Sequence, residues 1–362
     1  HREFVGRLAT GGDVIRTGGA AMTDLDGHGT HVAGIIAANR DGIGMHGVAP
    51  MARVLPIKWI SAKDENEETL TTYNEMLNRQ VQLGVRVSNN SWGFRTTPDE
   101  DDEDRYHSTR IQDVSISSYQ GIANLYRQAQ QAGIVFVFSA GNNAMGDVSF
   151  GAEPSVLAAL PQAFPFLEGQ WLAVVNITQG GQIANSSHRC GAAAAWCLAA
   201  PGTQIVSTYL NGQYAQLNGT SMAAPHVSGG LALLMQLFPT LSPAQIVQRV
   251  LVSANESGIY ADQAIYGQGL LDLDAASRPI GAVSAMSASG TVVLVGGQWH
   301  GGGTGTGDAL RRGLAGVDVV LKDALDAPFV FDAASVVLGN ELAARQQRET
   351  QWLDRLGDEA FS

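Results

Sequence analysis

The stretch "IVFVFSAGN" (134–142) decides the fold. It begins with an unbroken apolar run of β-branched and aromatic residues and ends at a Gly-Asn pair. A continuous apolar run of this kind is typical of a strand that is buried on both faces of a parallel sheet. Such a sheet needs helices on both faces, so the flanking sequence should alternate between strands and helices.

The flanking sequence does alternate. Helix 67–84 and helix 117–133 are each expected to end at a glycine, and Ser242 is a plausible cap for a third helix. The expected elements are strands at 52–60, 85–93 and 171–177, and helices at 67–84, 117–133 and 240–254. This order predicts an α/β fold, with a doubly wound, mostly parallel sheet and helices on both faces.

The pattern changes after about residue 280, so we expect a main domain at 1–280 and a small β-rich extension at 281–362. The extension contains a Gly-rich spacer (296–308), a β-type segment (317–338) and a polar helix (340–359).

Composition excludes some functions. The chain has 362 residues and a formal net charge of −12, with no basic cluster, so nucleic acid is not expected as a partner. No apolar run approaches the roughly 18–20 residues that a membrane-spanning helix needs. Cys190 and Cys197 are too few for a zinc site. A local disulfide is favoured over two free thiols, and it would indicate an oxidising compartment.

Three segments carry candidate chemistry: "DGHGTHVAG" (26–34), "SAGN" (139–142) and "NGTSMAAPHVSG" (218–229). Each places a reactive side chain at the end of an element, where helix N-termini and strand ends face ligands. His28 can act as a base and Ser221 as a nucleophile. For the Ser221 segment taken alone, the alternative is a simple helix cap.

Together, the three segments resemble the subtilisin-like serine proteases, and the resemblance covers residues 1 to about 280. It implies that His28 is the general base and Ser221 the nucleophile that forms the acyl-enzyme. It also implies that Asn142 donates to the oxyanion together with the Ser221 backbone N–H. Ser91-Trp92-Gly93 and Ser139-Ala140-Gly141 would flank the P1 pocket, with their backbone paired to an extended substrate.

The family's triad also needs an aspartate upstream of the histidine, at the end of a buried strand. Asp24 and Asp26 stand too close to His28 to reach its far ring nitrogen easily, and Asp13 lies in a Gly-flanked loop. The resemblance therefore implies that this aspartate lies just before residue 1. We expect either a late start of the sequence or an associated N-terminal fragment that supplies the aspartate.

A metal site is not expected. A His28–His31 pair lacks the HExxH spacing and a third ligand, so His31 is interpreted as a structural helix residue. No cofactor is needed for the chemistry, although structural calcium stays open.

The acidic run Asp99–Asp104 is interpreted as a solvated loop, with attraction of basic substrate residues or calcium binding as alternatives.

The segment "SSHRCGAAAAWCLAAPG" (186–202) resembles the subtilisin-like passengers of Gram-negative autotransporters. This implies export through the periplasm to the cell surface or medium, with 281–362 as a linker to a translocator absent from this sequence. The sequence thus predicts a secreted or surface serine endopeptidase acting on proteins or peptides. The alternative is a catalytically disabled domain that binds or supports other molecules. An esterase or peptide ligase is a third, weaker option.

Overall fold

The computed structural model describes residues 1–13, 23–59, 69–96, 107–143, 151–286, 292–295 and 314–333. The chain divides into two units, His1–Ser277 and Arg278–Ser362. The acidic run, the Gly-rich spacer and the expected polar helix at 340–359 lie outside the described residues.

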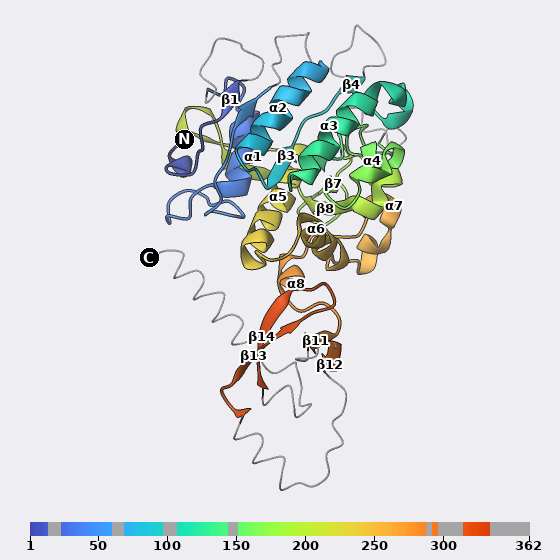
Figure 1. Cartoon of the computed structure of the whole chain (residues 1–362). Coiled ribbons are helices and arrows are strands. Elements are labelled where there is room, and N and C mark those ends of the chain that lie inside the picture. The colour runs from blue at the N-terminus through green and yellow to red at the C-terminus, as the bar shows by residue number, and fades with distance from the viewer. Residues whose placement is uncertain are drawn as a thin grey trace. The chain divides into compact units, whose positions relative to one another are not determined.

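A four-stranded parallel sheet forms the centre of the first unit (Figure 1). Its strand order is β3-β6-β7-β8. The strands are β3 (Val87–Asn90), β6 (Val135–Ser139), β7 (Trp171–Ile177) and β8 (Cys197–Pro201). Every residue of β6 and β7 is buried, as the continuous apolar runs predict.

Helices cover both faces of this sheet. On one face, the rings of Phe136, Phe138 and Trp171 each pack edge-on against Tyr126 of α3 (Gln120–Gln131), and Phe138 stacks on Trp171. Beside α3 lies α2 (Leu70–Gln82). Alternate strand residues face the other side, where α5 (Thr220–Leu237) lies against all four strands. These layers confirm the predicted α/β class.

The helix ends follow their local sequence. Gly84 and Gly133 take positive φ values of 67° and 95° after α2 and α3, which ends each helix as expected. Ser242 caps α6 (Pro243–Val252) in a reciprocal pair with Gln245. The other helices are α1 (His28–Ala37), α4 (Leu160–Ala163), α7 (Gln263–Tyr266) and α8 (Leu273–Ser277).

The strand expected at 52–60 is much shorter in the structure. Within the described residues 52–59, only Ile57–Lys58 forms a strand, β2, which pairs in parallel with β1 (Gly12–Asp13). Pro56 has no N–H to donate to a ladder, which accounts for the interruption. Among the described residues, no ladder joins β2 to β3, so these two strands belong to separate sheets.

Two short antiparallel strand pairs complete the described part of the first unit. One joins β9 (Ile205–Thr208) to β10 (Tyr214–Leu217), and the other pairs β4 (Arg95–Thr96) with β5 (His107–Ser108).

The second unit is an antiparallel sheet in the order β12-β11-β13-β14. Its strands are β11 (Val283–Met286), β12 (Val292–Val295), β13 (Asp318–Lys322) and β14 (Pro328–Asp332). Asp323 organises the turn between β13 and β14, because its Oδ1 accepts from the backbone N–H groups of Leu325 and Ala327. Among the described helices of the whole chain, none has the length and apolar character to cross a membrane.

Candidate active site

Ser221 is the second residue of α5, which follows a tight turn at Gly219 with φ of 143°. The Ser221 hydroxyl donates to the Ser91 carbonyl at 3.3 Å, and the Ser91 hydroxyl donates to the Ser221 carbonyl at 2.8 Å. This reciprocal pair fixes the predicted nucleophile beside the end of β3. A hydroxyl at a helix N-terminus also lies in the positive end of the helix dipole.

Asn142 reaches the same place from the end of β6. Its Oδ1 accepts from the Thr220 backbone N–H at 3.0 Å and from the Thr220 hydroxyl at 3.2 Å. Because the amide oxygen faces these donors, the Nδ2 hydrogens of Asn142 are available to a different acceptor. This arrangement suits a donor to an oxyanion formed at Ser221.

His28 is the first residue of α1. The start of α5 lies against this helix, where Met222 packs with Val32 and Ile35. Burial lowers the pKa of His28, although the nearby Asp26 and Asp24 oppose that effect. The imidazole is therefore neutral at neutral pH, as a general base requires. In this state the Ser221 hydroxyl is directed to Ser91 rather than to His28.

The two acidic residues before His28 build the start of α1. Asp24 accepts from the backbone N–H groups of Asp26, Gly27 and Thr30 and from the Thr30 hydroxyl. Burial alone would raise the pKa of Asp24, but these hydrogen bonds outweigh it and lower the pKa. Asp26 accepts from the His28 backbone N–H at 2.9 Å. Both carboxylates therefore bind backbone groups, while Asp13 is the last residue of β1.

His31 lies within the protein core. It is fully buried, and its Nε2 lies 3.1 Å from the Ile205 carbonyl and 3.0 Å from the Ala215 carbonyl. The ring thus joins α1 to the β9–β10 hairpin. Within the described ranges, no group of three or more His, Cys, Asp or Glu residues is placed to hold a metal ion.

The two predicted substrate-binding segments differ in accessibility. Gly93 is exposed, and a Cβ there would meet no atom within 4 Å. Ser139, Ala140 and Gly141 are buried. The Ala140 N–H and C=O are bound within the fold, by Val174 and Ser155 respectively. Residues 139–141 can therefore form a wall of the site, and pairing of a substrate strand with Ser91-Trp92-Gly93 stays a prediction.

The predicted disulfide is present. Cys190 and Cys197 are bonded across the 3₁₀ turn Gly191–Trp196, and the described chain has no free cysteine.

The structure adds three site neighbours that the motifs did not single out. Thr220 binds the Asn142 side chain, Ser108 binds the Asn142 backbone, and His188 donates its backbone N–H to the Gly141 carbonyl. Thr220 directly precedes Ser221 inside a quoted motif, so the sequence already indicates that the two residues are close. Ser108 lies in a distant segment that no motif marks, and the quoted segment 186–202 contains His188 without indicating its proximity to Asn142.

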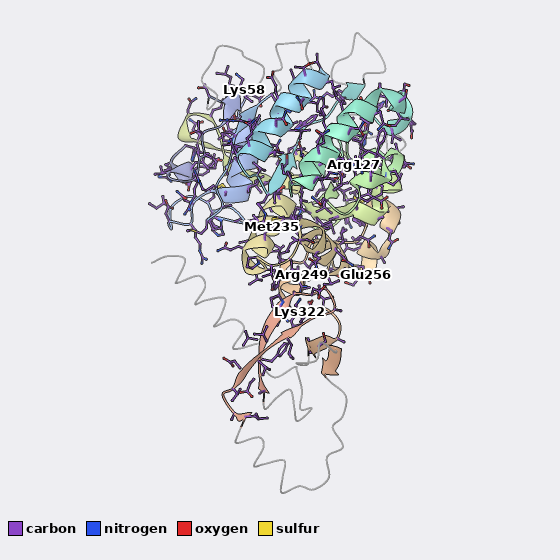
Figure 2. The ribbon with its side chains drawn as sticks, viewed as in Figure 1. Lys58, Arg127, Met235, Arg249, Glu256 and Lys322 are labelled. Carbon is purple, nitrogen blue, oxygen red and sulfur yellow. A yellow bond between two sulfur atoms is a disulfide. The ribbon has the colours of Figure 1, made fainter. Side chains whose placement is uncertain are left out.

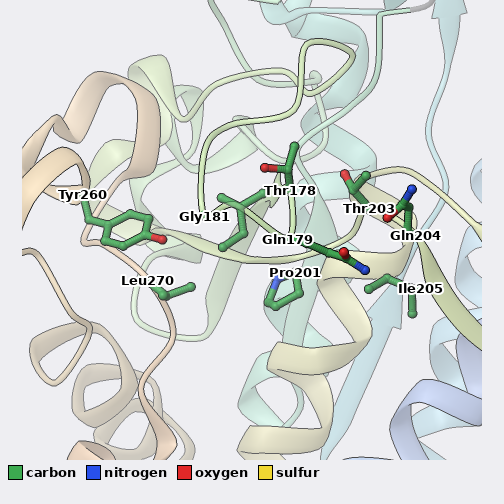
Figure 3. Close-up of a pocket in the computed structure, with 10 residues that line it drawn as sticks. Thr178, Gln179, Gly181, Pro201, Thr203, Gln204, Ile205, Tyr260 and Leu270 are labelled. Atoms are coloured by element: carbon green, nitrogen blue, oxygen red, sulfur yellow. The ribbon is translucent and has the colours of Figure 1, made fainter.

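A pocket of about 420 Å³ lies at the carboxyl ends of β7 and β8, whose last residues Ile177 and Pro201 line it (Figure 3). Thr203, Gln204 and Tyr260 also contribute. Neither His28, Asn142 nor Ser221 lines this pocket, so it is distinct from the site assembled above.

Comparison with known proteins identifies the family of the chain. The model of the subtilase family, peptidase S8, matches residues 15–269. The chain is 32% identical over 306 residues to an extracellular serine protease of Serratia marcescens, covering 70% of this chain but 28% of that protein. It is 30% identical over 268 residues to subtilisin DY of Bacillus licheniformis, covering 74% of this chain and 84% of that protein.

Further relatives extend the range. Serotype-specific antigen 1 of Mannheimia haemolytica is 28% identical over 304 residues, covering 70% of this chain and 32% of that protein. The solved structure of MycP1 from Mycobacterium smegmatis matches with a TM-score of 0.58 and 27% identity, covering 75% of each chain. The family match spans the central sheet and both helix starts that hold His28 and Ser221. This chain therefore belongs to the subtilase family.

Proposed function

We propose that this chain is a serine endopeptidase that hydrolyses peptide bonds through an acyl-enzyme. The observation that carries the proposal is the convergence of Ser221, Ser91 and Asn142 at the carboxyl ends of β3 and β6, with α1 packed beside the start of α5. Ligands of open α/β sheets bind at this edge.

In the proposed reaction, the Ser221 oxygen attacks the scissile carbonyl while His28 takes the hydroxyl proton. His28 then gives that proton to the leaving amine. Asn142 Nδ2 and the Ser221 backbone N–H donate to the oxyanion of the tetrahedral intermediate. A water molecule, activated by the same imidazole, hydrolyses the acyl-enzyme and regenerates Ser221.

The carboxylate that orients His28 is proposed to come from a strand outside the sequence given. Two observations support this. Asp24 and Asp26 are bound to backbone groups of the α1 start. The separate β1–β2 sheet and the β3 edge are not joined within the described part of the chain, so a strand carrying an aspartate can be added there.

A fluorophosphonate probe tests the proposal. We expect it to label Ser221 in the folded chain, and we expect Ser221→Ala and His28→Ala to abolish labelling. Ser253→Ala removes a hydroxyl from the helix end of α6 and is the matched control. Absence of labelling in a folded sample, together with absence of peptide cleavage, would contradict the proposed function. Intact mass and N-terminal sequencing of the same sample would identify an associated fragment.

The second candidate is a disabled subtilase domain that binds or supports other molecules. It is favoured by the arrangement around His28, because the neighbouring carboxylates in the described residues are engaged with backbone groups. Without an orienting carboxylate, turnover would fall by about 10⁴. Labelling of Ser221 at a rate comparable to that of a complete serine protease would exclude this candidate.

We also propose that the protein acts at the cell surface or in the medium of a Gram-negative bacterium. The Serratia relative is an extracellular serine protease, and the buried Cys190–Cys197 disulfide fits an oxidising compartment. Cell fractionation with an antibody to this chain should find it outside the cytoplasm, and recovery only with cytoplasmic markers would contradict this.

A further inference from the structure

The backbone around Asn142 is held at successive positions. The Gly141 carbonyl accepts from the His188 N–H at 2.9 Å, and the Asn143 N–H donates to the Ser186 carbonyl at 2.8 Å. Asn142 itself is bound by one residue on both of its backbone groups. Its N–H donates to the Ser108 hydroxyl at 2.9 Å, and its C=O accepts from the Ser108 N–H at 2.8 Å.

Ser108 is itself fixed. It is 8% exposed and lies in β5, where it pairs with Arg95 of β4. The next residue, Thr109, donates its N–H to the Phe94 carbonyl at 2.9 Å and accepts from the Val156 N–H at 2.7 Å. Ser108 is therefore held by its own pairing with β4 and by the two hydrogen bonds of the residue that follows it.

This pair also connects the two sides of the site. β4 begins at Arg95, two residues after Gly93, at the end of the proposed substrate-binding segment. Its partner β5 contacts the turn that carries Asn142. The β4–β5 pair thus lies between the proposed substrate-binding segment and the proposed oxyanion donor.

We propose that Ser108 is a positioning residue for Asn142, a role that rests on the proposed peptidase function. The oxyanion donor must sit about 2.7–3.1 Å from the developing charge, and a displacement near 1 Å can cost on the order of 100-fold in rate. Thr220 fixes the Asn142 side-chain oxygen, whereas Ser108 fixes the backbone from which that side chain extends. Loss of the Ser108 hydroxyl releases the Asn142 N–H and broadens the positions that the amide takes.

A double-mutant cycle on peptide hydrolysis tests this role. We expect Asn142→Ala to lower kcat by about 100–1000-fold and Ser108→Ala to lower kcat by about 10-fold or more with little change in KM. In the Asn142→Ala background, Ser108→Ala should cost less than about 2-fold, because its effect passes through the missing amide. Ser253→Ala is the control for loss of a hydroxyl remote from the site. An equal loss in both backgrounds, or a change confined to KM, would overturn the proposal.

Native-state hydrogen exchange gives a readout that does not require activity. In the unmodified chain, the Asn142 backbone amide should be protected, and Ser108→Ala should speed its exchange by at least about 10-fold while Ser253→Ala does not. Rapid exchange of this amide in the unmodified chain would overturn the positioning role without any variant. The two proposals can fail separately. If Ser221 is not labelled and peptides are not cleaved, but Ser108→Ala still speeds exchange of the Asn142 amide, the peptidase proposal fails while the fixing of the Asn142 backbone by Ser108 stands.

Discussion

At the scale of single residues, Gly141 shows how tightly the turn before Asn142 is packed. Its φ is 110°, and a Cβ would lie 2.8 Å from the Ser108 Cβ and 3.1 Å from His188 Nδ1. Gly84 also has a positive φ, of 67°, but a Cβ there would meet nothing within 4 Å. A comparison of alanine variants at these two glycines therefore separates the cost of backbone strain from the cost of steric crowding.

We predict that Gly141→Ala destabilises the fold more than Gly84→Ala. Both variants should lose about 1–2 kcal/mol of unfolding free energy, because alanine is strained at a positive φ. Gly141→Ala should lose about 1–3 kcal/mol more, because its Cβ overpacks the turn. Urea unfolding of the two variants measures the difference. Equal losses would show that the turn can move away from Ser108 at no cost.

Buried histidines make the fold sensitive to acid. His188 is fully buried, and its pKa is lowered to about 4, mainly by burial, with smaller contributions from His107, Arg110 and Arg189 and partial opposition from the Glu153 backbone. In the unfolded chain the ring takes a proton near pH 6.5, whereas in the folded chain it stays neutral down to about pH 4. The unfolded state thus binds more protons in this window, so stability falls as the pH falls through it.

We predict a loss from His188 of about 3 kcal/mol between pH 6.5 and pH 4. His188→Gln should flatten the dependence of the unfolding free energy on pH in this window. Part of the slope should remain, because burial also lowers the pKa of His28, His31 and His226. An unchanged slope in the variant, measured by denaturant unfolding at several pH values, would contradict the assignment.

The sequence predicted only part of this residue-scale detail. The positions of Ser221 near the start of α5 and of Asn142 after the end of β6 could be predicted, because each lies in a recognisable local pattern. Ser108 and His188 could not, since their roles arise where β5 and the segment 186–189 approach the Asn142 turn in space. The same limit applies to residues 139–141, whose backbone is occupied by neighbours that are distant in the sequence.

At the scale of elements, strands with continuous apolar runs were the most predictable. The run at 171–177 forms β7 with the same bounds, because burial on both faces favours apolar residues, and Asn176 is its one polar member. The run at 52–60 was overestimated, since Pro56 interrupts backbone pairing. The helix expected at 117–133 also includes residues 117–119 of the 3₁₀ turn Ile116–Tyr119 that precedes α3, because apolar spacing does not separate the two.

Helix α6 offers a direct test of a predicted cap. Ser242 and Gln245 each bind the other's backbone N–H. Ser242→Ala should lower the unfolding free energy by about 1 kcal/mol, and Gln245→Ala should cost less because Ser242 still caps the helix. The double variant should lose less than the sum of the two. Strict additivity in urea unfolding would show that the two hydrogen bonds act independently.

The disulfide closes a short loop. Cys190 and Cys197 are separated by 7 positions, so the bond restricts the unfolded chain only modestly. Replacing both by alanine should lower the unfolding free energy by about 2.5 kcal/mol, because the unfolded chain gains entropy. Reduction of the unmodified protein should lower its denaturation midpoint to a similar degree. A double variant as stable as the parent would show that native packing around the bond offsets this term.

At the scale of the whole molecule, the last helix of the first unit, α8, packs against α5 and α6. Arg249, labelled in Figure 2, is fully buried on α6 and donates through Nε to the Ala276 carbonyl of α8 at 2.6 Å. Its guanidinium also lies 4.6 Å from the centre of the Phe238 ring. Leu273 of α8 packs against Gly230, where a Cβ would lie 2.6 Å from the Leu273 Cδ2. The helix α8 thus covers both α5 and α6.

Two truncations test whether the first unit is complete at α8. A chain ending at residue 280 retains α8, so we predict cooperative unfolding and fluorophosphonate labelling of Ser221 at the full-chain rate. A chain ending at residue 272 removes the Ala276 carbonyl from a buried guanidinium and exposes the α5 surface at Gly230. Loss of a partner to a buried charge costs about 3–5 kcal/mol, so this shorter chain should unfold at a clearly lower urea concentration. If the chain ending at 280 were as unstable as the shorter one, residues 281–362 would be required for the first unit to fold.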